Sequence, residues 1–357
     1  MAIVLQRVKS ENHRRQATAL HWSGKKVNSG TIHKLSICGF FAVAMLFASQ
    51  LDAQNLTLEG QTGGFLTPTA YVVYSAKGQT FSHPAVGFHF VNTSKVIGNV
   101  ETVSITEGFA NRAEVGYTRS IHQVGDATNG GLDLSTLWNF NGMNVFHGKV
   151  VLLKDGQGSP FTPGIAVGGL VRVGDKFVTG ALDQEFALLH GIVISPKAYN
   201  NGDVYIAATK TWAKPPIPFL LNIGWKATNA EIFGLGGQST RFIGRAFGGL
   251  GIPLPLSHGI YAVPSFGFTQ EPPQVKNLGA ILVGGKAHLP TTLDYAVRIT
   301  QKDNPHFAFD IGIGQVAGII GQTAVPTGLP APAPPVVLVP VDLQAKHIVG
   351  MGLSIRY

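Results

Sequence analysis

HIVGMGLSIRY, residues 347–357, is the stretch that decides the fold. Apolar residues occupy every second position, and glycine or polar residues stand between them: the apolar set is Val349, Met351, Leu353, Ile355 and Tyr357. Successive side chains of a strand point to opposite faces, so one face of this strand is apolar and the other is polar. A terminal aromatic residue suits a membrane interface. We therefore predict the closing strand of a barrel whose outer surface faces lipid.

The same period of two recurs upstream, for example in residues 219–226, 294–300 and 307–313, and turn signals such as Asn200-Asn201-Gly202-Asp203 separate the segments. Bacterial single-chain barrels have even strand numbers. The sequence therefore predicts an all-β fold, an antiparallel transmembrane β-barrel of about 14 strands, within a range of roughly 12 to 16. Candidate strands are residues 79–91, 100–107, 112–121, 132–140, 145–154, 164–173, 186–195, 203–212, 218–228, 241–250, 259–268, 279–289, 294–302, 306–315 and 346–357.

The composition agrees with this prediction. Charged residues make up 13% of the chain and hydrophobic residues 45%, whereas soluble domains carry about 25% charged residues. Residues 1–53 hold seven of the 27 Lys and Arg residues and two of the 19 Asp and Glu residues, so the remaining chain carries about +3 instead of +8. The remaining basic residues are scattered, which argues against binding to nucleic acid.

The N-terminus has the order of a secretory signal. Basic residues precede an apolar run from Leu35 to Phe47, and Ala48-Ser49-Gln50 and then Leu51-Asp52-Ala53 follow it as the expected cleavage region. We expect residues 1–53 to be a signal peptide with a long basic n-region, cleaved after Ala53. A lipid anchor at Cys38 is disfavoured because the apolar run follows this cysteine. Removal of the signal also removes Cys38, the one cysteine of the chain.

Three regions follow the signal in this interpretation. Residues 54–78 are expected to be a periplasmic N-terminal segment, and residues 79–357 the outer-membrane barrel. Residues 325–340 contain six prolines, which cannot donate to a central ladder. They are expected to form an extended extracellular loop without ladder pairing, which serves either as a linker or as a binding loop.

Two motifs resemble a known group of proteins. Thr62–Ala70 reads TGGFLTPTA and Gly108–Tyr117 reads GFANRAEVGY. Together they resemble the start of poorly characterised bacterial outer-membrane β-barrels that are associated with exopolysaccharide secretion. The resemblance covers about sixty residues and carries no catalytic motif. It implies a non-enzymatic role in the envelope, with polysaccharide-export proteins as partners.

No catalytic, metal or cofactor site is predicted. Residues 279–287 superficially resemble a phosphate loop, but Gly285 interrupts the spacing and Ala287 replaces the hydroxyl that would hold magnesium. A hydrolase would need a serine, a histidine and an acid brought together. Ser195, His190 and Asp183 are near one another in sequence, and no spacing singles them out.

The polar face of the predicted strands supplies the candidate lumen residues: Arg112, Glu114, Thr118, Asp133, Asn139, Asn222, Lys226, Arg298, Asp310 and Arg356. Because these residues include both positive and negative charges, they favour a water-filled or plugged lumen without strong ion selectivity. The leading hypothesis is a pore or export conduit in the outer membrane of a Gram-negative bacterium. The alternatives are a structural or surface-interaction barrel without transport and, less favoured, an outer-membrane hydrolase. Expected partners are outer-membrane lipid and, through the C-terminal strand, the barrel-assembly machinery.

Overall fold

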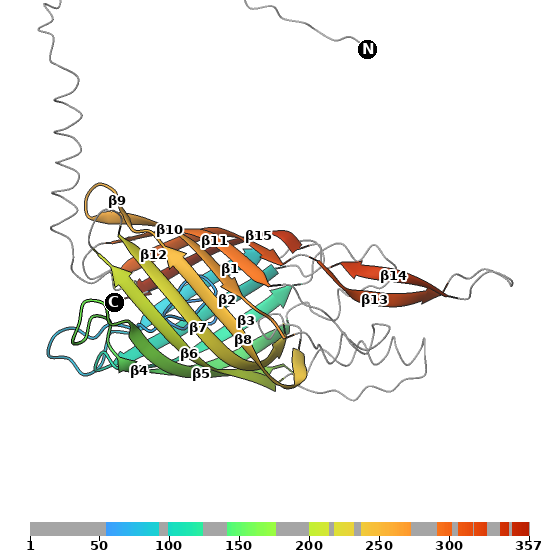
Figure 1. Ribbon diagram of the computed structural model, residues 1–357, viewed down its shortest axis with the longest axis horizontal. Helices are drawn as coiled ribbons and strands as arrows, with labels where there is room; N and C mark the ends of the chain where they lie inside the picture. The colour runs from blue at the N-terminus through green and yellow to red at the C-terminus, as the bar shows by residue number, and fades with distance from the viewer. Residues whose placement is uncertain are drawn as a thin grey trace, which may run out of the picture. The chain divides into compact units, whose positions relative to one another are not determined.

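Twelve antiparallel strands close into a barrel in the computed structural model (Figure 1). The structure describes residues 55–92, 99–123, 141–175, 200–213, 218–231, 237–272, 291–301, 306–316, 318–326, 336–342 and 345–356. The barrel strands are β1 (Ala85–Asn92), β2 (Asn99–Phe109), β3 (Ala113–Gln123), β4 (Asn141–Leu153), β5 (Gly164–Gly174), β6 (Asn200–Trp212), β7 (Phe219–Glu231), β8 (Gly237–Gly251), β10 (Ile260–Thr269), β11 (Thr292–Gln301), β12 (Phe307–Val316) and β15 (Ala345–Arg356).

Each barrel strand pairs with the next barrel strand in chain order, β10 with β11 among them, and the pairing of β15 with β1 closes the ring. The short β9 (Leu254–Pro255) adds to one end of β10. Among the described residues, no helix is long and apolar enough to cross a bilayer.

The estimate of about 14 strands was too high, although twelve lies within the predicted range. All twelve barrel strands coincide with predicted ones to within a few residues at most ends. Three further candidates, residues 132–140, 186–195 and 279–289, lie outside the described residues. The ring closes without them because β3 pairs directly with β4, β5 with β6, and β10 with β11.

The two faces of the wall differ in polarity, as the period of two predicts. In β2, Thr102, Ser104 and Thr106 are buried, whereas Val103 and Ile105 are exposed. The same outward apolar positions recur around the ring at Val115, Phe146, Val171, Val204, Ile223, Tyr295, Ile311 and Val349. An apolar outer band around a polar interior is the arrangement of a barrel that crosses a bilayer.

The two ends of the barrel have connections of different length. At the end where β1 begins and β15 ends, the links are residues 110–112, 154–163, 213–218, 252–259 and 302–306. Ala110 and Asn111 both have positive φ in the tightest of them, between β2 and β3, which is the backbone of a tight hairpin turn. The opposite end carries the longer links of residues 124–140, 175–199 and 270–291, together with the short links of residues 93–98 and 232–236.

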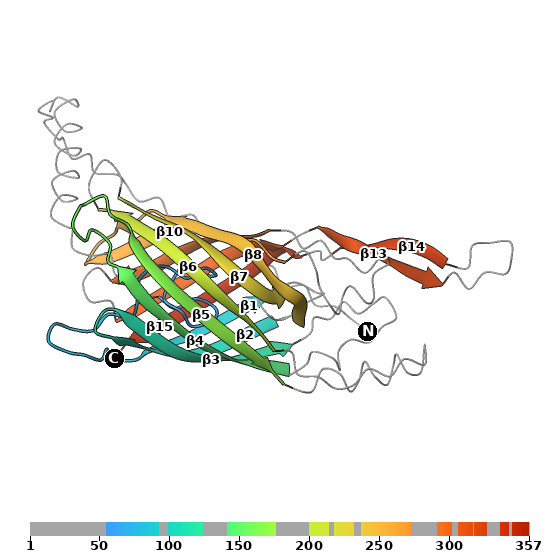
Figure 2. The same ribbon diagram turned by 60° about the horizontal axis from the view of Figure 1, so that its bottom comes forward.

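A segment that precedes the first strand fills the lumen (Figure 2). We call residues 55–76 the plug, because its side chains and backbone are largely buried and bond to inward residues of the wall. Leu56, Val73 and Ala85 form one small apolar cluster between plug and wall. The sequence analysis placed residues 54–78 ahead of the barrel as a separate segment, whereas residues 55–75 lie largely buried inside the barrel. Nothing in their pattern marks them as interior, because the lumen wall that they contact is polar.

The proline-rich stretch also differs from expectation at its ends. β13 (Ile319–Pro326) pairs with β14 (Val336–Asp342) in a two-stranded antiparallel sheet, with Gln322 opposite Pro340. Residues 327–335 lie outside the described residues. A ladder forms despite the prolines because both strands of a two-stranded sheet have an open edge, where a missing N–H costs no hydrogen bond.

Candidate functional site

Glu114 holds the plug at two points. One carboxylate oxygen, Oε1, accepts from the backbone N–H of Thr62 at 3.0 Å, and the other, Oε2, accepts from the Thr62 hydroxyl at 2.6 Å and from the Val73 N–H at 3.1 Å. Lys149, directly opposite on β4, places its Nζ 3.0 Å from Oε1 and donates to the Thr62 carbonyl at 2.9 Å. Both charged side chains are fully buried, so neither has water as a substitute partner.

A second ion cluster joins the plug to the next two strands of the wall, β5 and β6. Arg172 of β5 bonds through two nitrogens to the Glu59 carboxylate of the plug, one of these contacts measuring 2.8 Å. Its guanidinium also donates to Asp203 at 2.9 Å and to Asn201 at 3.1 Å, both on β6. A guanidinium has five N–H donors, and this cluster uses several of them at once. Arg172 therefore keeps partners in the wall even without the plug.

The third cluster is the pair Arg298 and Asp310, which stand opposite each other on β11 and β12. Arg298 Nε donates to Asp310 at 2.9 Å, and a second nitrogen donates to the Gly63 carbonyl at 3.1 Å. The Asn55 amide bonds to the other oxygen of Asp310. The clusters around Glu114, Arg172 and Arg298 are called the three clamps below.

Neutral side chains of the wall complete the set of contacts. Thr118 donates to the Glu59 carbonyl at 2.9 Å, Asn222 donates to the Pro68 carbonyl at 3.0 Å, and Thr209 accepts from the Ala70 N–H at 2.7 Å. Arg356 donates to the Tyr74 carbonyl at 3.3 Å. Plug backbone and wall side chains thereby satisfy one another, which is the requirement for polar groups buried away from water.

Two glycines allow the plug to lie close to the wall. Gly60 has φ of +87°, and a Cβ there would stand 2.3 Å from Thr118 Oγ1. At Gly108 of β2, a Cβ would stand 1.9 Å from the Val73 carbonyl oxygen. Only glycine fits either position, because the first needs a left-handed backbone and the second a direct approach of two main chains.

The structure brings most predicted lumen residues together around the plug. Glu114, Thr118, Asn222, Arg298, Asp310 and Arg356 are buried and contact it. Lys226 is half-buried and borders the lumen beside Arg172 and Asp203. Arg112 differs, because it lies in the link between β2 and β3 and donates to the Val151 and Leu152 carbonyls. Asp133 and Asn139 lie outside the described residues.

On the last strand, the predicted lipid-facing residues Val349, Met351, Leu353 and Ile355 are exposed on the outer surface. Tyr357 lies outside the described residues. Inward neighbours on the same strand, Ser354 and Arg356, bond to the plug at Leu56 and Tyr74. The alternation read from the sequence is thus present in the side chains of β15.

Several contact residues were missed by sequence reasoning. Lys149, Arg172 and Thr209 all bond to the plug. The sequence could have pointed to Lys149 and Arg172. Each is a charged residue in a strongly apolar strand, at a position that the period of two turns toward the lumen. The plug residues themselves carried no such signal.

No group of three metal-binding side chains occurs among the described residues. The hydrolase candidates Ser195, His190 and Asp183, and the phosphate-loop-like residues 279–287, all lie outside the described part of the chain.

No protein-family model matches this chain, and no curated protein matches it. Solved structures with a similar chain path include a KdgM porin, at 7% identity and a TM-score of 0.39, covering 76% of this chain and 99% of the other. The Acinetobacter baumannii outer membrane protein Omp33 aligns at 8% identity with a TM-score of 0.33, and the alignment covers 78% of this chain and 99% of Omp33. The β domain of the Bordetella autotransporter BrkA aligns at 11% identity with a TM-score of 0.36, and the alignment covers 78% of this chain and 100% of that domain.

Proposed function

We propose that this protein is an outer-membrane β-barrel that acts as a pore or export conduit, and that its plug keeps the lumen closed until the plug moves. The observation that carries the proposal is a polar lumen filled by one segment of the same chain. Short links at the end where β1 begins and β15 ends favour a periplasmic position for that end, since periplasmic turns are short and extracellular loops are long.

The width of the barrel supports a conduit. Twelve strands about 4.8 Å apart and tilted by roughly 40° enclose a backbone cylinder of about 12 Å radius. Eight strands give an interior that side chains alone can fill, so twelve leave a space that needs further material. The plug provides this material, and its removal would open a path through the lumen.

The chemistry of the plug contacts also supports movement. Most contacts pair plug backbone groups with wall hydroxyl, amide and charged side chains, as at Thr118, Thr209 and Asn222. Water can replace such bonds once it enters the lumen, because each exchanged hydrogen bond has a net value of only about 1 kcal/mol. An interior held by a large apolar core would not separate in this way.

A structural barrel without transport is the second candidate. The full burial of Glu114 and Lys149 favours it, because removing one partner of such a pair costs about 3–5 kcal/mol. Three clamps of this kind could keep the plug in place permanently. The two functions differ in whether the plug ever leaves the lumen.

A reversible lock on the plug tests the proposal. An ideal Cβ at Gly164 lies 3.5 Å from Ala70 Cβ, within the range of a disulfide, so Ala70→Cys with Gly164→Cys should join plug to wall. Planar-bilayer recordings would compare the wild type, the oxidised and reduced double variant, and each single variant. A gated pore predicts opening events in the wild type and the reduced form, and none in the oxidised form.

Two results would count against the pore. Equal conductance of the oxidised and reduced forms would show that the plug does not gate. Absence of conductance in every form, including a folded Glu114→Gln variant with a weakened clamp, would favour the structural barrel. The resemblance to exopolysaccharide-associated barrels makes a hydrophilic polymer the first substrate class to try, by adding dextrans to one side of a conducting pore.

A further inference from the structure

The plug carries one charged residue, Glu59. Its carboxylate accepts from two nitrogens of the Arg172 guanidinium on β5, the paired arrangement that makes an arginine–carboxylate contact strong and specific. In the other two clamps the wall supplies both charges, and the plug contributes only neutral groups. Arg172 therefore marks the place where the plug brings a negative charge to the wall.

Two further basic residues stand beside Arg172. Lys226 of β7 lines the same part of the lumen as Glu59 and Arg172, and Arg245 of β8 is directly opposite Lys226 in register. Among the described residues, Lys226 forms no salt bridge, and Arg245 bonds to two main-chain carbonyls. Like charges that face each other on neighbouring strands repel, so an anion between them would be stabilised. We call Arg172, Lys226 and Arg245 the basic group.

Two acidic residues of the described wall interact electrostatically with the basic group: Asp203 on β6 and Glu271 just beyond β10. Asp203 is bonded to Arg172 at 2.9 Å. Burial raises the pKa of the Glu271 carboxyl to about 7, so Glu271 is only partly ionised near neutral pH. When the plug leaves, Glu59 leaves with it, and the three cations keep Asp203 and a partly protonated Glu271. The basic group then carries uncompensated positive charge.

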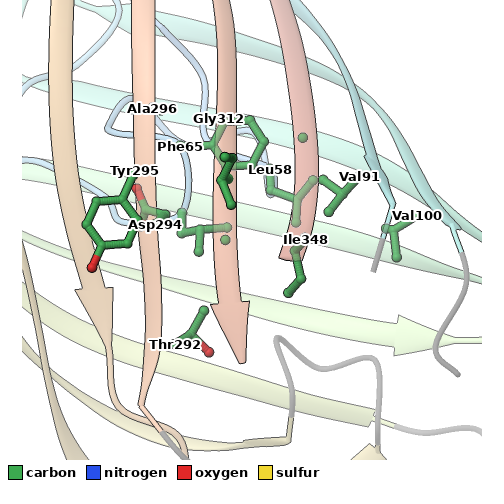
Figure 3. Close-up of a pocket in the computed structure, with 14 residues that line it drawn as sticks. Leu58, Phe65, Val91, Val100, Thr292, Asp294, Tyr295, Ala296, Gly312 and Ile348 are labelled. Atoms are coloured by element: carbon green, nitrogen blue, oxygen red, sulfur yellow. The ribbon is translucent and has the colours of Figure 1, made fainter. Parts of the chain in front are cut away.

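The lumen beside β1, β11, β12 and β15 offers no comparable group. Leu58 and Phe65 of the plug face a mostly apolar lining there, with Val91 and Ile348 among its side chains (Figure 3). Asp294 is the one charged residue among the described residues of that lining, and its charge is negative. An anion in the open lumen would therefore be attracted to β5, β7 and β8.

We propose that the basic group binds the carboxylates of an acidic polymer in the open lumen, and that Glu59 occupies this site while the plug is in place. The inference rests on the proposed function, because the site becomes free only when the plug moves. The two Arg172 nitrogens that bond to Glu59 can bind a carboxylate of the solute in the same geometry. The site lies toward the end with the longer links, because Arg172 is two residues from the end of β5. Such a conduit prefers acidic chains to neutral chains of equal length.

Block of the open-pore current in planar bilayers tests the site on the full-length protein. The two probes are carboxymethyl-dextran and unmodified dextran of the same chain length, so they differ in charge and share one backbone. Each is added to either side, and the current is measured during open intervals. We expect carboxymethyl-dextran to halve the current at a concentration roughly tenfold lower than dextran, which corresponds to about 1.4 kcal/mol.

Two variants assign the preference to the basic group. Lys226→Gln removes a cation that forms no described salt bridge, so it should raise the blocking concentration of carboxymethyl-dextran roughly threefold and leave that of dextran unchanged. Arg172→Lys keeps a positive charge beside Asp203 but lacks the planar fork, so it should shift the block in the same direction. Lys154→Gln is the matched control, because Lys154 is an exposed lysine in the link of residues 154–163. Gel mobility without boiling confirms that each variant is folded.

The outcomes separate this inference from the proposed function. Equal block by the two polymers in a conducting pore would overturn the inference and leave the pore standing. An unchanged preference in both folded variants, Lys226→Gln and Arg172→Lys, would also overturn it. A protein that never conducts in any form would overturn the proposed function and this site together.

Discussion

Thr62 and Glu114 are 52 residues apart in sequence, and the Thr62 hydroxyl donates to Glu114 Oε2 at 2.6 Å. Thr62 begins the motif TGGFLTPTA in the plug, and Glu114 lies within the motif GFANRAEVGY of the wall. The two motifs that stand out in the sequence are therefore the two sides of one clamp. Their joint occurrence has a physical reason, since the buried carboxylate needs the donors that the plug supplies.

Replacing Glu114 by Gln should loosen the plug and destabilise the barrel. The amide keeps the shape but leaves Lys149 without its counter-ion, and its NH₂ group cannot accept from Thr62 or Val73. We expect a loss of about 3 kcal/mol in the free energy of unfolding, measured by urea titration in lipid vesicles. We also expect faster proteolysis between Leu56 and Val73.

A second variant separates the loosening of the plug from the loss of barrel stability. Adding Lys149→Met to Glu114→Gln removes the unpaired buried cation, so most of the stability should return. The plug should stay loosened, because the hydrogen bonds to Thr62 and Val73 are still missing. Recovery of protease resistance along with stability would contradict the assignment of Glu114 as a clamp.

Glu59→Gln should have a smaller effect than Glu114→Gln. Arg172 retains Asp203 at 2.9 Å and Asn201 at 3.1 Å after the change, so its charge stays paired. Lys149 has no such second carboxylate among its described contacts. The same urea titration should give a loss of roughly 1 kcal/mol. A loss equal to that of Glu114→Gln would show that the wall partners do not compensate.

The wall of the barrel could be predicted from sequence, and the plug could not. Alternation places Arg298 and Asp310 inward because each lies between outward apolar residues on a strand, and a period of two leaves no other choice. The plug has no regular period, and its burial depends on contacts with residues far along the chain, such as Ser354 and Arg356. Such contacts follow from barrel closure and leave no local pattern.

The strand count shows a related limit. Residues 132–140 alternate at most positions, with Leu132, Leu134, Trp138 and Phe140 on one face, yet β3 and β4 pair without an intervening strand. Alternation reports that a segment is amphipathic, whereas membership in the ring depends on which strands pair. Arg112 was assigned to the lumen for the same reason, and its place in a tight link could only come from the turn geometry at Ala110 and Asn111.

The stability of the barrel should fall as pH rises through neutrality, because of Glu271. This residue lies just beyond the end of β10, and burial raises the pKa of its carboxyl from 4.5 to about 7, against the opposing effect of Lys226. The raised pKa means that the protonated form favours the folded state. Its stabilising contribution is complete below about pH 4.5 and is lost as pH rises through about 7.

The expected size of this effect is roughly 3 kcal/mol between pH 4 and pH 8, at about 1.4 kcal/mol per unit of pKa. Glu271→Gln removes the titrating group, so the difference between the two pH profiles isolates its contribution. Parallel profiles for the wild type and the variant would show that Glu271 is solvated in the folded protein.

If the outer apolar band faces lipid, an arginine substitution should cost more stability inside the band than outside it, even at two apolar residues that are both exposed. Ile223, in the middle of β7, is 57% exposed, and Phe161, in the link of residues 154–163, is 79% exposed. If lipid surrounds the strands, Ile223→Arg places a charge in hydrocarbon and should cost about 2–4 kcal/mol. Phe161→Arg lies outside the band, so it should cost less than about 1 kcal/mol although it exposes more surface. The folding yield into lipid vesicles measures the effect of each substitution. Equal yields for the two variants would mean that the band does not face lipid. That outcome would also remove the physical basis for treating the lumen as a path across a membrane.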